Sequence, residues 1–527
     1  MNLNNNQDDE VWGGTPEYRQ AEAEWVKREK ENPSEADPKL TQEELLATVA
    51  LDEGLTIFHD QFKETYGILP DRYRSCVRLS STEFKRWFAH VIREKMKRAS
   101  VSKVARAAAI EVLDGWAIYK NEQHNLEVRV AHHAGAVWFN LGHGQAVRID
   151  KGGWSITNDV PILFKEVSHE LPQVEPVSGG SITELFKFLN VPKNELGFSA
   201  KQLLIVAWLV TAFIPDFPHP ILTFYGPHGS AKTTNADVLQ ALIDPSSTQS
   251  LSFPKDINEL AQIAAHHHLM SFDNLSTISQ QHSDMLCRIC TGGGFSKRKL
   301  YSDQEDIIFQ FRRIIMLNGI NISLGNSDLL DRALLVGLER FSKFGSASAF
   351  WKRFEEAKPR ILGAIFDLLV KALQAIETVP EDVDFRMADF ARYGCAVTQV
   401  LGLDPSEFTT AYRANVDKSE DESLAASIIG PIVMSFMASR SSWEGTPTEL
   451  HRGLEQEALF ANVDTKAAYI WPKSPHWLKK RIELVVTILD HKGIKIRWDF
   501  PAPGRVTITN ENAENIPNDG NVVLPPL

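Results

Sequence analysis

The feature that most constrains this chain is a short apolar segment followed by a glycine-containing turn and a helical segment. Residues 221–225 (ILTFY) are typical of a buried strand, and residues 233–243 (TTNADVLQALI) predict an amphipathic helix. The turn region between and around them comprises Gly226, Pro227, His228, Gly229, Ser230, Ala231, Lys232, Thr233 and Thr234. A strand, a glycine turn, Lys-Thr and a helix in this order are typical of a phosphate-binding P-loop. We therefore expect an α/β core with a parallel sheet.

Each part of this loop suits the phosphates of a nucleotide. Glycines let backbone N–H groups surround phosphate oxygens, and the helix N-terminus adds a favourable dipole. Lys232 would neutralise the outer phosphates, and the Thr233 hydroxyl would bind Mg²⁺. Ala231 stands where the usual loop has its second glycine, which is tolerable if its φ angle is negative. The alternative is an ordinary strand-turn-helix with a surface lysine.

A second acidic motif follows one intervening helix. Residues 268–274 (HLMSFDN) predict a strand that ends in Asp273, at the tip of the strand next to the loop strand, where it would hold Mg²⁺. Asn274 occupies the position at which many ATPases carry a glutamate that activates water. Because an amide cannot accept the proton of water, Asp284 and Glu259 are alternative acids, or turnover is slow. Asp273 alternatively is only a turn residue.

A glycine-rich and basic stretch follows at residues 291–303 (TGGGFSKRKLYSD). Two short arms around this centre predict a protruding hairpin with Phe295, Lys297, Arg298 and Lys299. The next strand ends in Asn318, which is suited to sense the γ-phosphate or the attacking water. Arg332 then follows Asp328 and Asp331 and precedes another strand.

Together, these motifs resemble superfamily 3 AAA+ helicases, and more closely the helicase-like ATPases of phages, plasmids and integrative elements, over about 220–340. The resemblance continues weakly at 386–394. It implies an ATP-binding motor that forms a ring, with DNA in the central pore. Lys297, Arg298 and Lys299 would contact the DNA backbone and Phe295 a sugar or base. Asn318 would act as a sensor, and Arg332 would reach the ATP of a neighbouring subunit. The alternatives are a solvated loop for the three cations and an ion pair with Asp328 or Asp331 for Arg332.

The C-terminal region predicts a winged helix. Residues 446–449 (TPTE) form a helix-capping box, Ser474-Pro475 opens a second helix that runs to about Gly493, and two strands around a PAPG turn form a wing. Lys479, Lys480 and Arg481 lie on the candidate recognition helix, with Arg497, Lys495 and Arg505 on the wing. Such modules bind DNA or other proteins, and both readings stay open.

Length and pattern suggest several domains in the 527 residues. We expect an acidic, disordered tail (1–40), an N-terminal α+β domain (41–175), an AAA+ P-loop ATPase core (176–345), a helical region (346–425), a winged-helix domain (426–515) and a tail (516–527). The net charge of −12 argues against a surface that is basic throughout, but permits a local basic channel. Four scattered cysteines favour a reducing compartment, and no segment is typical of a signal peptide or membrane span. We expect a cytoplasmic protein without a membrane partner.

These observations predict an ATP- and Mg²⁺-dependent DNA-translocating motor, a hexameric replicative helicase of a mobile element. Two alternatives remain open. One is an ATP-gated DNA-binding or initiator protein with weak hydrolysis, and the other is an ATPase switch that acts on protein partners in defence against phage.

Overall fold

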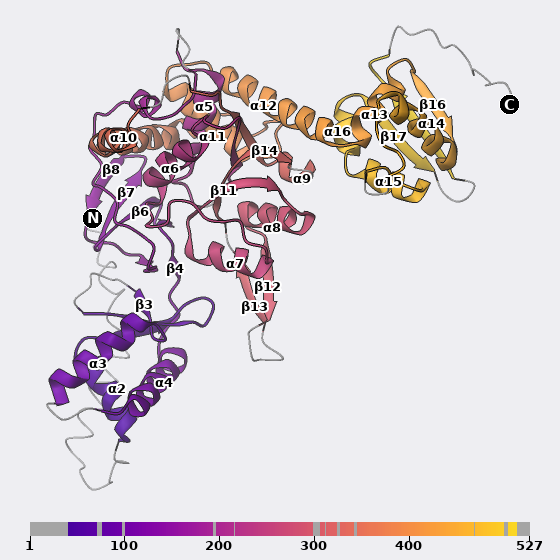
Figure 1. Cartoon of the computed structure of the whole chain (residues 1–527). Helices are drawn as coiled ribbons and strands as arrows, with labels where there is room; N and C mark the ends of the chain where they lie inside the picture. Colours follow the sequence, from indigo (N-terminus) through magenta and orange to yellow (C-terminus); the bar gives the residue numbers. More distant parts are fainter. Residues whose placement is uncertain are drawn as a thin grey trace, which may run out of the picture. The chain divides into compact units, whose positions relative to one another are not determined.

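The computed structural model describes residues 40–70, 76–96, 101–192, 197–215, 217–298, 306–310, 312–323, 327–341, 345–467, 470–499 and 504–513. The chain divides into a smaller compact unit, which ends at Gln123, and a larger one, which contains 124–527 and the short segments 60–64 and 71–76. The segment 41–175 is therefore distributed over both units, which are shown in Figure 1.

The smaller unit combines three helices with a three-stranded sheet. Its elements are α2 (Gln42–Asp52), β1 (Thr56–His59), β2 (Thr65–Ile68), β3 (Cys76–Arg78), α3 (Thr82–Met96) and α4 (Lys103–Tyr119). The helix α2 begins with a capping box, in which the Thr41 side chain accepts from the Glu44 N–H and Glu44 accepts from the Thr41 N–H. Phe84 and Phe88 of α3 are fully buried in the core of this unit.

The larger unit begins with an antiparallel sheet in the order β5-β6-β7-β8. Its strands are Val130–His133, Ala136–Gly142, Gln145–Asp150 and Gly153–Thr157. Short β-branched runs that alternate with glycine turns over 126–156 favour such strands. A parallel pair, β4 (Leu126–Glu127) with β9 (Leu163–Phe164), accompanies this sheet.

The central sheet is parallel and is buried on both faces. It comprises β10 (Ile221–Tyr225), β11 (Leu269–Thr277), β14 (Ile314–Ser323) and β15 (Ala333–Gly337). Alternate residues of each strand enter two different hydrophobic cores, as period-2 side-chain alternation requires. Leu222, Met316 and Leu334 belong to one core, whereas their neighbours Ile221, Ile315 and Leu335 belong to the other.

The strand order corrects one expectation from the sequence. The sheet runs β11-β14-β10-β15, so β14 separates the acid-bearing strand β11 from the loop strand β10. The sequence pattern could not decide this order, because all four strands are similarly apolar runs. Because β14 lies between β10 and β11, its residue Asn318 lies between the loop strand and the strand that carries Asp273.

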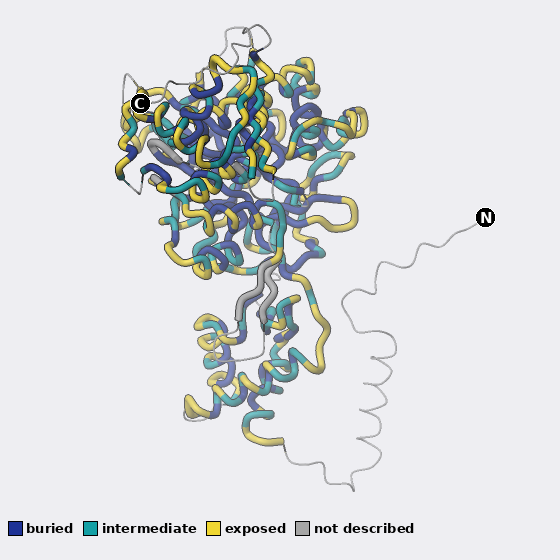
Figure 2. The backbone as a smooth tube through the Cα atoms, turned by 90° about the vertical axis from the view of Figure 1, so that its right-hand side faces the viewer, coloured by how far each residue is buried: buried dark blue, intermediate teal, exposed yellow. Residues whose placement is uncertain are grey.

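Helices cover both faces of this sheet (Figure 1). One core contains α5 (Ala200–Thr211), α6 (Lys232–Ile243), α10 (Ala347–Ala375), α11 (Ala388–Val400) and part of α12 (Pro405–Ala426). The other contains α7 (Ile257–His266), α8 (Gln280–Thr291) and α9 (Ser327–Leu330). The apolar run at 203–214 forms the buried helix α5 and its C-terminal turn. Buried residues are dark blue in Figure 2.

The strand β15 lies at one edge of the central sheet, where its backbone groups lack a strand partner on one side. Asn415, on α12, supplies a substitute. Its amide nitrogen donates to the Leu335 carbonyl at 2.7 Å, and its oxygen accepts from the Leu335 N–H at 3.0 Å. Asn415 is buried, so this pair satisfies polar groups that would otherwise be desolvated without a partner.

The C-terminal segment has its own hydrophobic core. Its elements are α13 (Ile429–Met437), β16 (Ser442–Gly445), α14 (Pro447–Phe460), α15 (Pro475–Glu483), α16 (Val486–His491), β17 (Ile494–Asp499) and β18 (Arg505–Asn510). The antiparallel order is β16-β18-β17. The helix expected to run from Ser474 to about Gly493 is divided into α15 and α16, and its assignment to a winged helix stays a prediction.

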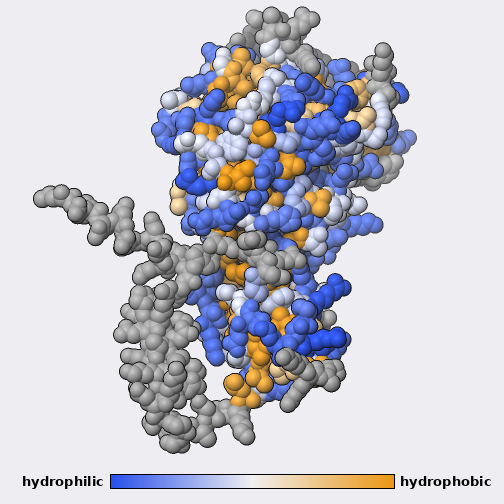
Figure 3. Space-filling view, turned by 90° about the vertical axis from the view of Figure 1, so that its left-hand side faces the viewer, coloured by the Kyte–Doolittle hydropathy of each residue, from blue (hydrophilic) through white to orange (hydrophobic). Residues whose placement is uncertain are grey.

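No helix among the described residues is both long enough and apolar enough to cross a membrane. On the face of the larger unit seen in Figure 3, apolar side chains are scattered among hydrophilic ones rather than gathered into one patch.

Candidate functional site

The turn after β10 needs glycine at its first position. Gly226 has φ +145°, and a Cβ atom there would lie 2.4 Å from the Leu338 carbonyl oxygen. Gly229 has φ +77°, in the left-handed region that favours glycine. Pro227 and His228 are exposed, whereas Ser230 is fully buried. The turn is therefore an exposed loop whose backbone requires glycine at two positions and whose last serine is buried.

Ala231 does not meet the condition under which an alanine would be tolerated in the loop. Its φ and ψ angles are +58° and +33°, so its backbone is left-handed and its φ is not negative. The residue precedes the first turn of α6, and its side chain has no capping role. A left-handed alanine costs roughly 1–2 kcal/mol, so the loop stores strain that glycine would not.

Ala231→Gly is expected to raise the free energy of unfolding by about 0.5–1 kcal/mol, because relief of strain exceeds the added unfolded-chain entropy. Denaturant midpoints of the two proteins measure the difference. The control Ala414→Gly, at an exposed position inside α12, should instead destabilise by about 1 kcal/mol. Equal destabilisation by both variants would show that the loop at Ala231 is not strained.

The first residues of α6 hold a cation at the loop. The Lys232 ammonium donates to the carbonyls of Gly226 and Pro227 at 2.9 and 3.0 Å. Burial lowers the pKa of Lys232, while the charge of Asp273 opposes this shift. Thr234 follows in the same first turn and is partly exposed. Lys232 is therefore held where it would meet phosphate oxygens on the loop.

Thr233 and Asp273 meet at the carboxyl edge of the sheet, although forty residues separate them in the sequence. The Thr233 hydroxyl donates to Asp273 Oδ2 at 3.1 Å. The next residue, Asn274, has φ +58°, and its backbone N–H donates to Asp273 Oδ1 at 2.6 Å and to Asn318 Oδ1 at 3.1 Å. Only 1% of Asn318 is exposed, and its amide nitrogen has no hydrogen-bond partner among the described residues. The structure thus joins four of the residues that the motifs singled out, Thr233, Asp273, Asn274 and Asn318.

A further carboxylate, Asp237, belongs to none of the predicted motifs and was missed. It lies four residues after Thr233 on α6, so the two share one face of the helix. Burial, and secondarily the charge of Asp273, raise the pKa of Asp237 to about 6, and its Oδ1 is buried without a partner in the described part of the chain. The i, i+4 spacing from Thr233 was the available signal. By contrast, Glu259 and Asp284 are exposed, and Asp284 accepts from Gln280 on its own helix.

The donor set suits a hard divalent cation. A hydroxyl and carboxylates are the oxygen ligands that Mg²⁺ prefers, and Mg²⁺ commonly takes only one or two protein ligands besides nucleotide phosphates. In the described part of the chain no group of three or more His, Cys, Asp or Glu side chains is arranged to hold a metal. Cys287 and Cys290 are buried on α8, and burial raises the pKa of both thiols.

Asn190, a second residue that the sequence motifs did not single out, forms hydrogen bonds to the loop. Its amide nitrogen donates to the carbonyls of Ser230 and Glu339 at 2.9 and 2.7 Å, and its N–H donates to the Asn235 side chain at 3.0 Å. Asn190 therefore connects the loop, α6 and the segment after β15. No sequence motif marks such a residue, because its partners are mostly backbone groups.

The basic hairpin is present. Strands β12 (Gly294–Arg298) and β13 (Asp306–Gln310) pair antiparallel, with Phe295 opposite Phe309 and Lys297 opposite Ile307. Phe295, Lys297 and Arg298 lie on β12, and Lys299 lies outside the described residues. Their contact with DNA stays a prediction.

Arg332 forms an ion pair with Asp328, which was the alternative to a role at a neighbouring subunit. Its guanidinium donates to the Asp328 carbonyl at 2.7 Å and to the Asp328 carboxylate at 2.5 Å, and only 14% of its side chain is exposed. Arg386 contacts the same carboxylate at 2.6 Å and Asp331 at 3.3 Å. Asp328 is therefore shared by two arginines. Whether Arg332 also serves a neighbouring subunit stays a prediction.

The candidate DNA-binding cations of the C-terminal segment divide into two groups. Lys479 pairs with Glu483 at 3.6 Å, and Arg497 pairs with Asp499 at 3.0 Å. Lys480 and Arg481 are exposed, and none of the ion pairs among the described residues includes them.

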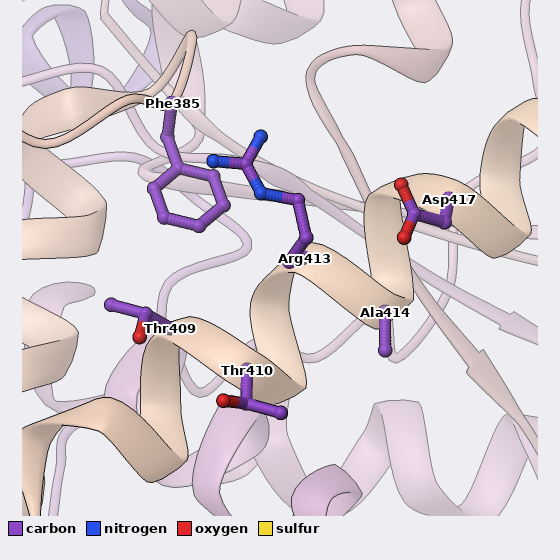
Figure 4. A pocket seen from close by; sticks show the side chains of 6 residues that line it. All are labelled: Phe385, Thr409, Thr410, Arg413, Ala414 and Asp417. Carbon is purple, nitrogen blue, oxygen red and sulfur yellow. The ribbon is translucent and has the colours of Figure 1, made fainter. Parts of the chain in front are cut away.

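An open groove of about 450 Å³ lies on α12 (Figure 4). It is lined by Phe385, Thr409, Thr410, Arg413, Ala414 and Asp417. The Arg413 guanidinium lies 4.2 Å from the centre of the Phe385 ring and pairs with Asp384 at 3.2 Å. The groove contains none of the loop residues, so it is not part of the site around Thr233 and Asp273.

Two solved structures illustrate a distant likeness. The apo C-terminal region of NrS-1 matches with a TM-score of 0.41 and 10% identity, over 88% of this chain and 98% of that chain. A JCV helicase bound to a small molecule matches with a TM-score of 0.20 and 18% identity, over 45% of this chain and 72% of that chain. No curated protein matches the chain.

Two family models match consecutive parts of the chain. Residues 187–422, which include the loop, the acidic strand and the hairpin, match the actinomycete integrative conjugative element replication protein. Residues 429–518 match the C-terminal domain of the same RepA family. Together these two segments form the greater part of the chain, and they relate it to the RepA replication proteins of actinomycete integrative conjugative elements.

Proposed function

We propose that this chain is an ATP- and Mg²⁺-dependent motor that moves along DNA during replication of an integrative element. The hydrogen bond between Thr233 and Asp273 is the observation that carries the proposal. A P-loop hydroxyl that meets a strand-end carboxylate is the arrangement that binds Mg²⁺ in nucleotide triphosphatases. The match to a replication-protein family supports the biological setting.

In this proposal each residue around the loop has one task. The loop N–H groups and Lys232 bind the phosphates, and Thr233 and Asp273 hold Mg²⁺, which would neutralise charge on the transferred phosphoryl group. The buried amide nitrogen of Asn318, which has no partner within the described part of the chain, would donate to the γ-phosphate or to the attacking water. Asp237 would accept from water bound to the ion.

The motor would be a ring, as the motif order implies, with six subunits as the leading expectation. Arg332 would then reach the ATP of the next subunit. To do so it must leave Asp328, and Arg386 would remain there to neutralise the carboxylate. The exchange of Asp328 between two arginines would link subunit assembly to nucleotide binding. The hairpin residues Phe295, Lys297, Arg298 and Lys299 would contact the DNA.

A specific observation favours a second function, an ATP-gated initiator with weak hydrolysis. The position after Asp273 carries an amide, and its backbone N–H is already bonded to Asp273 and Asn318. The carboxylate of Asp237 is close enough to Asp273 for its pKa to be raised by that charge, but Asp237 lies one helical turn beyond Thr233 on α6. ATP would then control assembly on DNA rather than drive movement.

ATP turnover with and without single-stranded DNA separates the functions. For a motor we expect turnover to rise at least about tenfold with DNA, because DNA contacts complete the catalytic geometry. The variant Lys297→Ala/Arg298→Ala/Lys299→Ala should lose this stimulation, whereas Lys352→Ala/Arg353→Ala, two exposed cations on α10, should keep it. Slow turnover that ignores DNA, together with ATP-dependent DNA binding, would favour the initiator. Loss of DNA binding by the triple variant would argue against a switch that acts on proteins.

A further inference from the structure

An exposed tryptophan begins the most basic helix of the C-terminal segment. Trp477 is 57% exposed on the first turn of α15, which Ser474 caps. Leu478 and Ile482 turn to the core of the segment and are fully buried. Two side chains of α15 lie close to its ring. The Lys480 ammonium lies 4.8 Å from the ring centre, and the His476 ring lies 6.1 Å away at 71°.

Charge is concentrated around this ring. Between Asp464 and Glu483 the sequence contains five Lys or Arg and no acidic residue, in a chain whose net charge is −12. The helical spacing from Trp477 to Lys480 and Arg481 is i+3 and i+4, so all three residues share one face. We call the exposed residues His476, Trp477, Lys480 and Arg481 the Trp477 face.

The cations of the β17–β18 hairpin are each paired with a carboxylate. Lys495 pairs with Glu511 at 2.5 Å, Arg497 pairs with Asp499 at 3.0 Å, and Arg505 pairs with Glu444. A phosphate would have to compete with these carboxylates. Lys480 and Arg481 belong to no ion pair among the described residues, so α15 offers the more available positive charge.

We propose that the Trp477 face binds single-stranded DNA, with a base stacked on Trp477 and the neighbouring phosphates on Lys480 and Arg481. An aromatic ring flanked by cations is the combination that holds single strands, because every base has a face to stack and every nucleotide carries a phosphate. In a duplex each base is stacked on both faces by its neighbours, so a tryptophan ring cannot stack on it. Protein interfaces are depleted in lysine, whereas here the Lys480 ammonium lies 4.8 Å from the centre of the Trp477 ring.

This site is separate from the ATPase residues, so its test needs no nucleotide. Binding of a fluorescently labelled oligothymidine is measured by anisotropy without ATP. Trp477→Ala is expected to weaken binding about 5- to 100-fold, and Trp477→Phe should retain most of the affinity because a ring remains. Lys480→Ala/Arg481→Ala should weaken binding and lower the salt slope by about 1.4, the contribution of two single-strand phosphates.

The hairpin contacts of the proposed motor could hide these effects. The same measurements are therefore repeated in the Lys297→Ala/Arg298→Ala/Lys299→Ala background, where Trp477→Ala should reduce the remaining affinity by the same factor. Lys495→Ala is the matched control, because its cation is already paired, and it should change binding less than about twofold. Thermal unfolding of each variant confirms that the exposed substitutions leave the fold intact.

Three results would overturn the proposal. Trp477→Ala could bind the oligonucleotide as tightly as the unaltered chain. Affinity could fall with Arg497→Ala rather than with Trp477→Ala, which would place the DNA on the β17–β18 hairpin. Trp477→Ala could leave DNA binding unchanged but alter the oligomeric state in sedimentation, which would make the face a protein interface.

Discussion

Lys232→Ala is expected to weaken nucleotide binding about 100-fold and to lower ATP turnover by a further factor of about 10²–10³. The ammonium contacts two loop carbonyls from the first turn of α6, so it lies where the phosphates would bind. Without it, phosphate charge at the loop would be balanced only by backbone N–H groups and Mg²⁺. Anisotropy of a fluorescent ATP analogue measures the affinity, and phosphate release measures turnover.

The same variant should remain folded. Lys232 contacts two carbonyls at an exposed loop, so its loss should change the free energy of unfolding by less than about 1 kcal/mol. Lys352→Ala, at an exposed position on α10, serves as the matched control for both assays. Full DNA-stimulated turnover by a folded Lys232→Ala protein would exclude a phosphate-binding role for this loop and, with it, the proposed motor.

The second large effect concerns stability and a buried arginine far from the loop. Arg129 is fully buried, and its guanidinium contacts Asp244 at 3.0 Å and Glu170 at 3.1 Å. It also donates to the carbonyls of Asn140, Leu171 and Pro245. Asp244 caps the end of α6 and accepts from the N–H groups of His268 and Leu269, where β11 begins. Arg129 thus joins the β5–β8 sheet, the loop helix and the acid-bearing strand.

The pKa values of Asp244 and Glu170 show how burial and the charge of Arg129 oppose each other in this cluster. Burial alone would raise the pKa of Asp244, but the charge of Arg129 and the hydrogen bonds hold it below its ordinary value. For Glu170 burial prevails over Arg129, and the pKa is raised to about 7. Removal of the cation that contacts both carboxylates would leave these two side chains buried without its compensating charge.

Arg129→Met is therefore expected to lower the free energy of unfolding by about 3–5 kcal/mol, as for other buried pairs that lose one partner. Denaturant unfolding measures the loss. The control Arg148→Met removes a half-exposed arginine paired with Asp150 and should cost less than about 1 kcal/mol. The double variant Arg129→Met/Asp244→Asn should recover part of the stability, because it also removes a buried charge. An Arg129→Met protein as stable as the control would show that the cluster does not hold these elements together.

Local features of the fold were predictable from the sequence. The strand at 221–225, the turn, the start of α6 and the glycine-rich hairpin each depend on neighbouring residues and on backbone preferences of glycine and apolar runs. The split of the last long helix into α15 and α16 was missed, because continuous apolar spacing masks a break at residues 484–485. The condition of a negative φ at Ala231 is not met, since the turn imposes its conformation on whichever residue stands there.

The sequence by itself determined the residues of the turn after β10, because a strand, a turn and a helix that follow one another form one contiguous segment. Tertiary structure decided which distant groups join it. The place of β14 between β10 and β11 sets Asn318 beside Asn274, and α6 sets Asp237 near Asp273. The structure also decided which cations are already neutralised, as Arg332 and Arg497 are, and which remain exposed, as Lys480 is. Such pairings depend on the approach of elements far apart in the chain, and no local pattern encodes that approach.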